Sequence, residues 1–234
     1  MANLTGRRRA RYVQDMFSRI AYRYDLMNRV MTAGQDIAWR QEVICRAALP
    51  PGARLLDLGA GTGDLAREAT RQIPGCQAVA ADFTLQMMLA GRSRPGANRL
   101  DWVSADALQL PFPSGTFDAV VSGFLLRNVI DIPLVLQEHY RVLKPGGRMV
   151  CLDTTRPPRN FLSPLINFHL HFVIPALGEL LTGEGEAYTY LPESTEKFLG
   201  AEELAARMMA ARFQGVGFRR LMFGTVAIHW GERR

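Results

Sequence analysis

The residues best suited to chemistry gather around a glycine-rich stretch in the first third of the chain. Residues 54–58 form a short apolar run that contains Asp57 and follows a Pro-Pro-Gly break, as expected of a buried strand. Glycine then occupies alternate positions, at Gly59, Gly61 and Gly63. Because glycine has no Cβ, the backbone there can turn tightly and a ligand can lie against it. An amphipathic helix over 64–72 opens with Asp64, so its N-terminus would lie close to that ligand. The pattern predicts a nucleotide-binding loop.

The acids at the two ends of this loop indicate which kind of ligand it can bind. The usual dinucleotide fingerprint is G-x-G-x-x-G, which puts a pyrophosphate at the helix N-terminus. Here the spacing is G-x-G-x-G, and Asp64 stands where the third glycine would be. Carboxylates at Asp57 and Asp64 disfavour an anionic pyrophosphate and suit a ligand with positive charge, such as a sulfonium that also carries an amino group. S-adenosylmethionine fits that description.

Further acids and small residues follow the other expected strands. The strand over 77–81 ends at Asp82, about twenty residues after the glycines, where a carboxylate for a ribose diol is expected. Asp106-Ala107 follows the strand over 100–104, and an acid next to a small residue there could bond an adenine amino group and offer the base a backbone donor. The alternative for Asp57 and Asp82 is that they only cap strand ends.

The elements that must position these residues alternate along the chain. Strands are expected at 54–58, 77–81, 100–104, 117–123 and 148–152, with helices between them at 64–72, 85–92 and 131–143. Thr84 is the expected N-cap of the second helix. Further helices are expected at 12–20, 36–48 and 202–213, and a terminal hairpin pairs 217–222 with 225–230. This alternation predicts an α/β fold with a doubly wound parallel sheet.

Ligands bind such sheets at the carboxyl ends of the strands. Gly123 lies at one such end, and Arg127 and Asn128 follow it, so both side chains are expected to face the reacting group. The alternative for Arg127 is a surface or ion-pairing arginine. The predicted cofactor-binding residues are Asp57, Gly59, Gly61, Thr62, Asp82, Asp106, Ala107 and Gly123.

Two segments flank or interrupt this core. Residues 1–48 are predicted to form a helical lid ahead of the domain over 49–234, and the aromatic and charged stretch at 21–28, with Tyr24, could close over the cofactor. The alternative is a helix cap in which its tyrosines pack on the domain. A helical insertion is expected at about 160–200. Its apolar part, 161–181, would form a wall over the site for an apolar substrate or would lie in a membrane interface. A helical pair that merely covers the core is the other reading.

Composition sets the remaining bounds. With 234 residues and 48% hydrophobic content, the chain can bury one substantial core. No apolar run is long enough to span a membrane and the basic start lacks the apolar stretch of a signal peptide, so a cytoplasmic location is expected. The three cysteines are isolated, which indicates neither a disulfide framework nor a metal site. The net charge of +6 is partly local: Arg7, Arg8, Arg9 and Arg11 are expected to form a solvated, partly disordered arm, with contact to anionic lipid or nucleic acid as the alternative.

Together these motifs resemble the ubiquinone/menaquinone biosynthesis C-methyltransferase family over nearly the whole chain, from Met16 to Gly231. The matching segments are 16–28, 57–65, 110–113, 126–129, 140–147 and 190–194. The first of them and Leu-Arg-Asn-Val at 126–129 are far more specific than the glycine loop. The resemblance implies a Rossmann-like class I methyltransferase with a seven-stranded, mostly parallel sheet whose last strand is antiparallel. It also implies methyl transfer from S-adenosylmethionine to a ring carbon of a polyprenylated quinol, with Thr62, Asp82, Asp106 and Ala107 at the cofactor.

The same resemblance frames a mechanism. A hydroquinone carbon becomes strongly nucleophilic as its hydroxyl ionises, and a phenolic pKa near 10 opposes that at neutral pH. Arg127 would stabilise the phenolate, while Asn128 and Tyr24 orient the ring. The proton could leave through water, His171 or Asp153.

Two departures from the family pattern bear on the substrate. Leu125 stands where the family usually has glycine, and it is expected to narrow the acceptor site. Asp153-Thr154-Thr155 resembles the menaquinone-only members. We therefore expect demethylmenaquinol as the acceptor, with the benzoquinol precursor of ubiquinone or another small lipophilic molecule as alternatives. Peripheral membrane contact follows from such a substrate, no nucleic-acid partner is expected, and the oligomeric state is open, with a homodimer as one option.

Three other functions remain open from the residues alone. A nicotinamide-dependent dehydrogenase is disfavoured by the loop spacing, an RNA-binding module or RNA methyltransferase would use the basic arm, and a noncatalytic scaffold would bind partners without turnover.

Overall fold

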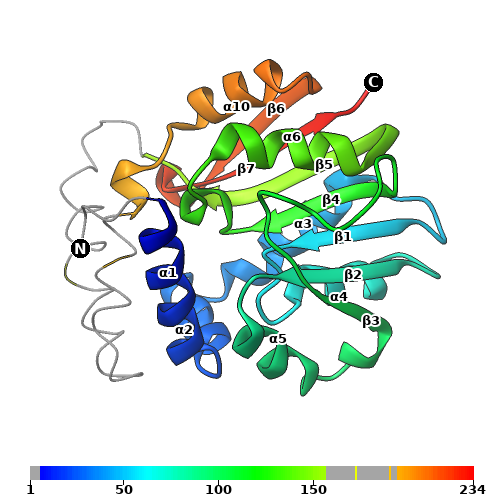
Figure 1. Ribbon diagram of the computed structural model, residues 1–234. Coiled ribbons are helices and arrows are strands. Elements are labelled where there is room, and N and C mark those ends of the chain that lie inside the picture. The colour runs from blue at the N-terminus through cyan, green and yellow to red at the C-terminus, as the bar shows by residue number, and fades with distance from the viewer. Residues whose placement is uncertain (1–5, 157–171, 173–189, 191–193) are drawn as a thin grey trace.

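The computed structural model describes residues 6–156, 172, 190 and 194–234. Its centre is a seven-stranded sheet in the order β3-β2-β1-β4-β5-β7-β6 (Figure 1). The strands are β1 (Arg54–Leu58), β2 (Gln77–Asp82), β3 (Leu100–Ser104), β4 (Phe117–Gly123), β5 (Leu143–Thr154), β6 (Gln214–Leu221) and β7 (Val226–Glu232). The first five pair in parallel, and β7 runs antiparallel to both β5 and β6. This confirms the predicted sheet with its antiparallel last strand.

Helices cover both faces of this sheet. On one face, α3 (Gln35–Ala47) and α4 (Asp64–Gln72) bury Val43, Ile44 and Ala66 against strand residues such as Leu55 and Val121. On the other, α6 (Ile132–Val142) and α10 (Ala201–Ala210) pack against Leu56, Val120 and Met149. The central strands are apolar on both faces because each face is covered, as parallel sheets require.

The predicted bounds of five elements coincide with the structure, namely β1, α4, α5 (Leu85–Arg92), β3 and β4. Strand β5 begins earlier than expected, at Leu143. Phe117 pairs with Leu143 and Ala119 with Arg148, so residues 144–147 bulge out of the ladder, and Gly146 has a φ of +80° there. The residues between the expected helix over 131–143 and the expected strand over 148–152 therefore form a bulge within a longer strand. Thr84 does precede α5, but its side chain makes no capping hydrogen bond.

The N-terminal helices form a separate layer at the carboxyl ends of the strands (Figure 1). Helix α1 (Gly6–Ile20) and α2 (Tyr24–Met31) share a small core of Met16, Ile20 and Met27. The arginine arm was expected to be partly disordered; that is wrong, because α1 already begins at Gly6 and the arm forms its first turns. Helix α1 runs without a break from these arginines to Met16 and Ile20, and the apolar face of the helix packs in the small core shared with α2.

The predicted insertion over 161–181, with His171, lies outside the described residues, and the division at residue 48 stays a prediction. Among the helices of the described segments, none is long and apolar enough to cross a bilayer.

Candidate active site

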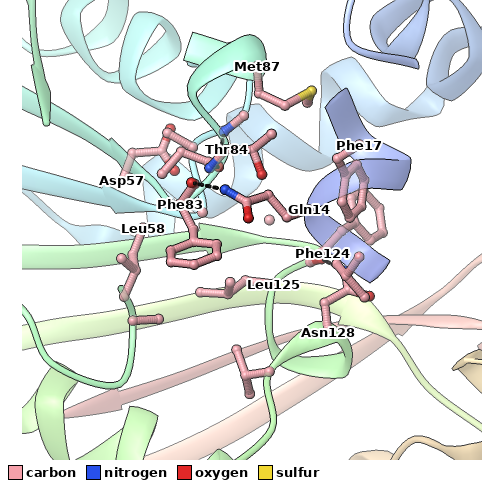
Figure 2. A pocket seen from close by; sticks show the side chains of 18 of the residues that line it. Gln14, Phe17, Asp57, Leu58, Phe83, Thr84, Met87, Phe124, Leu125 and Asn128 are labelled. Atoms are coloured by element: carbon pink, nitrogen blue, oxygen red, sulfur yellow. Dashed lines mark hydrogen bonds between the residues drawn. The ribbon is translucent and has the colours of Figure 1, made fainter. Parts of the chain in front are cut away.

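A cavity of about 500 Å³ lies at the carboxyl ends of β1, β2 and β4, within the range typical of ligand pockets. Helix α1 closes one side of it, and the glycine loop after β1 forms the opposite side (Figure 2). All the predicted cofactor-binding residues line it: Asp57, Gly59, Gly61, Thr62, Asp82, Asp106, Ala107 and Gly123. Of the three predicted catalytic residues, Tyr24 and Asn128 line it and Arg127 does not.

The glycine loop fits tightly against its surroundings. Gly59 has a φ of +66°, and a Cβ there would lie 2.8 Å from Cδ1 of Leu125. Gly61 has a φ of +57°, and a Cβ there would lie 3.1 Å from Cε of Met87. The amide of Gly59 donates to the carbonyl of Ala81 at 2.9 Å, which ties the loop to β2. Glycine is therefore required here both for the backbone conformation and for the space.

Asp57 is a strongly perturbed acid in the cavity wall. It is 1% exposed, and its Oδ2 accepts the amide of Ala66 at 3.0 Å. Its Oδ1 is buried and has no hydrogen-bond partner among the described residues. Burial, helped by the negative charges of Asp64 and Asp82, raises the pKa of Asp57 to about 7. A cavity wall that holds an orphaned carboxylate oxygen fits a ligand that brings a positive charge or an N–H or O–H donor.

Asp82 is held by the backbone around it. Its Oδ2 accepts the amide of Gly61 at 2.7 Å, and its Oδ1 accepts the amide of Thr84 at 2.7 Å. Burial nevertheless raises the pKa of Asp82, with those hydrogen bonds opposing the rise. Each oxygen keeps a second lone pair, so the carboxylate can still accept a hydroxyl. Asp106 is exposed, and its Oδ1 accepts the amide of Leu108 at 2.9 Å.

Thr62 lines the cavity and also makes a hydrogen bond that the sequence did not indicate. Its hydroxyl donates to Oδ1 of Asp25 on α2 at 2.8 Å, in a buried position. Asp25 is also paired with Arg94 at 2.9 Å, and burial raises the pKa of Asp25. Nearby, Arg40 of α3 pairs with Asp64 at 3.1 Å. The N-terminal helices are thus bound to the cofactor loop through polar contacts.

The other side of the cavity is apolar and aromatic, and its residues come from α1, from the β2–α5 connection and from the loop after β4. Phe17, Phe83 and Leu125 point into it in Figure 2. Gln14 of α1 donates through Nε2 to the carbonyl of Phe83 at 3.0 Å and so holds the helix across the mouth. Sequence reasoning missed Gln14, Phe17 and Phe83 as site residues. The signal was present in α1, because an amphipathic helix must cover something apolar.

Tyr24 and Asn128 are both fixed in place. The ring of Tyr24 packs edge-on against Phe17 with centroids 5.7 Å apart. Burial raises the pKa of Tyr24, and the positive charge of Arg127 partly opposes this, so the phenol is a neutral donor near pH 7. Asn128 donates through Nδ2 to the carbonyl of Phe124 at 2.9 Å and accepts the hydroxyl of Tyr190 at 3.2 Å.

Arg127 does not face the cavity as expected. It is 6% exposed, and its Nη1 donates to Oδ1 of Asp153 at 2.9 Å. The amide of Arg127 donates to the other oxygen of that carboxylate at 3.2 Å. The geometry matches the ion-pairing alternative, because the buried carboxylate at the end of β5 requires a cationic partner. The guanidinium lies behind the cavity wall, near enough for its charge to act on Tyr24.

A doubly wound sheet with a glycine loop, a carboxylate near the end of each of the first two strands and a cavity at the strand ends defines a Rossmann-like nucleotide-binding enzyme. Several solved structures with the same fold are named as methyltransferases. One is a SAM-dependent methyltransferase from Thermotoga maritima, with TM-score 0.64, 19% identity, and coverage of 94% of this chain and 99% of that one. Another is a phosphoethanolamine N-methyltransferase from Haemonchus contortus in complex with S-adenosyl-L-methionine, with TM-score 0.61, 14% identity, and coverage of 84% and 52%.

Comparison at the level of sequence is more specific. Residues 5–233 match the ubiE/COQ5 methyltransferase family. A protein of Desulfotalea psychrophila named ubiquinone/menaquinone biosynthesis C-methyltransferase UbiE is 47% identical over 94% of this chain and 90% of its own length. A demethylmenaquinone methyltransferase of Thermus thermophilus is 44% identical over 93% of this chain and its whole length. This chain belongs to the ubiE/COQ5 methyltransferase family and is a SAM-dependent methyltransferase.

Proposed function

We propose that this protein methylates a ring carbon of demethylmenaquinol, with S-adenosylmethionine as the methyl donor. The observation that carries the proposal is a single cavity with two unlike sides. One side offers glycine backbone and buried carboxylates, and the other offers aromatic and aliphatic side chains. Relatives whose names state this activity, such as the protein from Thermus thermophilus, support it.

In this proposal the polar side holds the donor. The orphaned Oδ1 of Asp57 accepts from the amino group, Asp82 accepts from the ribose hydroxyls, and Asp106 with Ala107 receives the adenine. Gly59, Gly61, Thr62 and Gly123 supply backbone and space. When bound, S-adenosylmethionine supplies an electrophilic methyl: the methyl–sulfur bond breaks as the new carbon–carbon bond forms, sulfur leaves as a neutral thioether, and the ring carbon then loses a proton.

The apolar side holds the acceptor ring. Tyr24 donates its phenolic hydrogen to a ring oxygen, and Asn128 orients the ring from the loop after β4. Arg127 stabilises the developing phenolate through its charge rather than through contact, and Asp153 weakens this effect by partly neutralising it. Asp153 already accepts from Arg127 and Thr154, so we propose water as the acceptor of the ring proton.

Leu125 sets the shape of the acceptor space. Its side chain lies against Gly59 and points into the cavity between the two sides (Figure 2). A flat ring that slides between Leu125 and Phe83 suits this narrow space. The second candidate acceptor is the benzoquinol precursor of ubiquinone, which the dual name of the Desulfotalea psychrophila relative favours.

A polyprenylated acceptor also implies contact with the inner face of the cell membrane, where such a quinol dissolves. Vesicles that carry the quinol should therefore recruit the protein.

The roles of the acceptor side are tested by Tyr24→Phe and Asn128→Ala. Each variant should lower turnover about tenfold to a hundredfold, because one oriented donor or one ring contact is lost. Affinity for S-adenosylmethionine should stay unchanged. Tyr22→Phe is the matched control, since Tyr22 is 76% exposed and lies two residues away. Full turnover in both variants would mean that the acceptor lies elsewhere.

A further inference from the structure

A second hollow, of about 480 Å³, lies outside the cofactor cavity, where α2, α3 and α4 meet the segment 95–99. We call it the arginine groove. Its lining contains more arginines than acids. The arginines are Arg29, Arg40, Arg67, Arg71 and Arg99, and the acids are Asp64 and Glu68. A concave surface with this excess of positive charge attracts anions more strongly than the same charges on a convex face.

The arginines divide into an inner pair and an outer set. Arg40 pairs with Asp36 and Asp64, and Arg67 pairs with Asp64 and donates to the carbonyl of Thr62 at 3.2 Å. These contacts fix the inner two side chains. An anion in the groove would therefore meet guanidinium groups that are already oriented, with less loss of side-chain freedom on binding.

The outer arginines have donors to spare. The nearest carboxylate to Arg29 is Asp36, at 3.8 Å, and the side chain of Arg29 is 42% exposed. Arg99 has no ion pair within the part of the chain that the structure describes. Arg71 pairs with Glu68 but keeps 62% of its side chain exposed. The planar guanidinium, with its fork of N–H donors, matches the oxygens of a phosphate group.

We propose that the arginine groove binds a phosphate group of an anionic ligand. The phosphate can belong to a lipid headgroup or to a free phosphate compound. Exposed apolar residues favour the lipid. Ile37 forms part of the groove wall, Leu26 and Val30 are exposed on α2, the helix that carries Arg29, and Tyr22 is exposed just before that helix. Apolar side chains beside arginines suit the interface of an anionic bilayer.

The groove is distinct from the cofactor cavity although they share a wall. Arg40 and Asp64 line both hollows, whereas Arg29 and Arg99 line only the groove. Changing the latter two should therefore affect anion binding without affecting the donor site, whatever the acceptor of the methyl group is.

The test titrates inorganic pyrophosphate into the full-length protein by calorimetry at fixed ionic strength. The dissociation constant should rise about tenfold or more in Arg29→Gln/Arg99→Gln, since two charge-assisted contacts are lost. The control is Arg207→Gln/Arg212→Gln, which removes the same charge from exposed positions on and just after α10, the helix that packs on the opposite sheet edge (Figure 1). Affinity for S-adenosylmethionine should match the wild type in both double variants.

A parallel arm measures sedimentation with vesicles of phosphatidylglycerol and of phosphatidylcholine. Loss of phosphatidylglycerol binding in the groove variant alone would support the site and identify the phosphate as that of a lipid. Pyrophosphate binding that depends on the groove, with vesicle binding that does not, would support the site for a free phosphate compound. Equal losses in both double variants, or no binding of pyrophosphate or vesicles by the wild type, would overturn the proposal.

Discussion

The buried carboxyl of Asp57 makes the enzyme less stable at high pH, and Asp57→Asn tests this directly. The folded pKa of Asp57 is about 7, against an unfolded value of about 3.9. The folded chain therefore holds a proton that the unfolded chain has lost between about pH 4 and pH 7. Stability falls as pH rises through this window and is level above it. Three pKa units correspond to about 4 kcal/mol, an upper value because neighbouring acids titrate together.

Asparagine mimics the protonated acid and can still accept the amide of Ala66. Without S-adenosylmethionine, Asp57→Asn should be more stable than the wild type by about 1 kcal/mol at about pH 5 and by about 2–4 kcal/mol at about pH 8. For a chain of this length the gain corresponds to roughly 5–12 °C in melting temperature. The variant should also bind S-adenosylmethionine at least about tenfold more weakly, because a charge-assisted contact is lost.

The assay is urea unfolding at both pH values, together with calorimetric titration of the donor. Asp101→Asn is the matched control, since Asp101 is exposed on β3 and should change neither quantity. A variant that is no more stable than the wild type at about pH 8 would refute the claim that the buried charge of Asp57 destabilises the fold at high pH.

Three further predictions concern the packing around the site. Gly59→Ala should weaken donor binding because its Cβ would lie 2.8 Å from Leu125, and Leu125→Ala in the same chain should restore part of the loss in a calorimetric titration. Thr62→Val should lower the free energy of unfolding by about 1–3 kcal/mol, since the buried carboxyl of Asp25 loses a donor; unchanged denaturant midpoints would contradict this. Arg127→Leu should cost about 3–5 kcal/mol by leaving a buried carboxylate unpaired, and adding Asp153→Leu should recover most of it; equal losses in single and double variants would argue against the ion pair.

The sequence predicted the sheet well because its signals are local. The apolar runs of β1, β3 and β4 and the glycines after β1 each mark their own boundaries, and parallel strands with helices between them allow few topologies. The cavity-lining acids were predictable for the same reason, since a residue at the carboxyl end of a parallel strand must lie at the ligand-binding edge.

The remaining features depend on contacts between distant residues. The residues around Arg127 in the sequence do not indicate that its guanidinium pairs with Asp153, twenty-six residues later. The side chain therefore does not point toward the ligand as expected. The bond between Thr62 and Asp25 spans thirty-seven residues, and it shows why the N-terminal helices lie on the cofactor loop. The residues of the arginine groove likewise come from three helices, and no spacing of residues within the sequence indicates that these helices meet.

The central claim is methyl transfer to the ring carbon of a naphthoquinol. The most direct measurement incubates the purified protein with methyl-labelled S-adenosylmethionine and, in separate reactions, reduced demethylmenaquinone and the reduced demethylated ubiquinone precursor, then detects labelled product by mass. We expect label in the naphthoquinol, on a ring carbon. No label in either quinol, from protein that still binds the donor, would contradict the proposed acceptor and the role of the apolar side of the cavity.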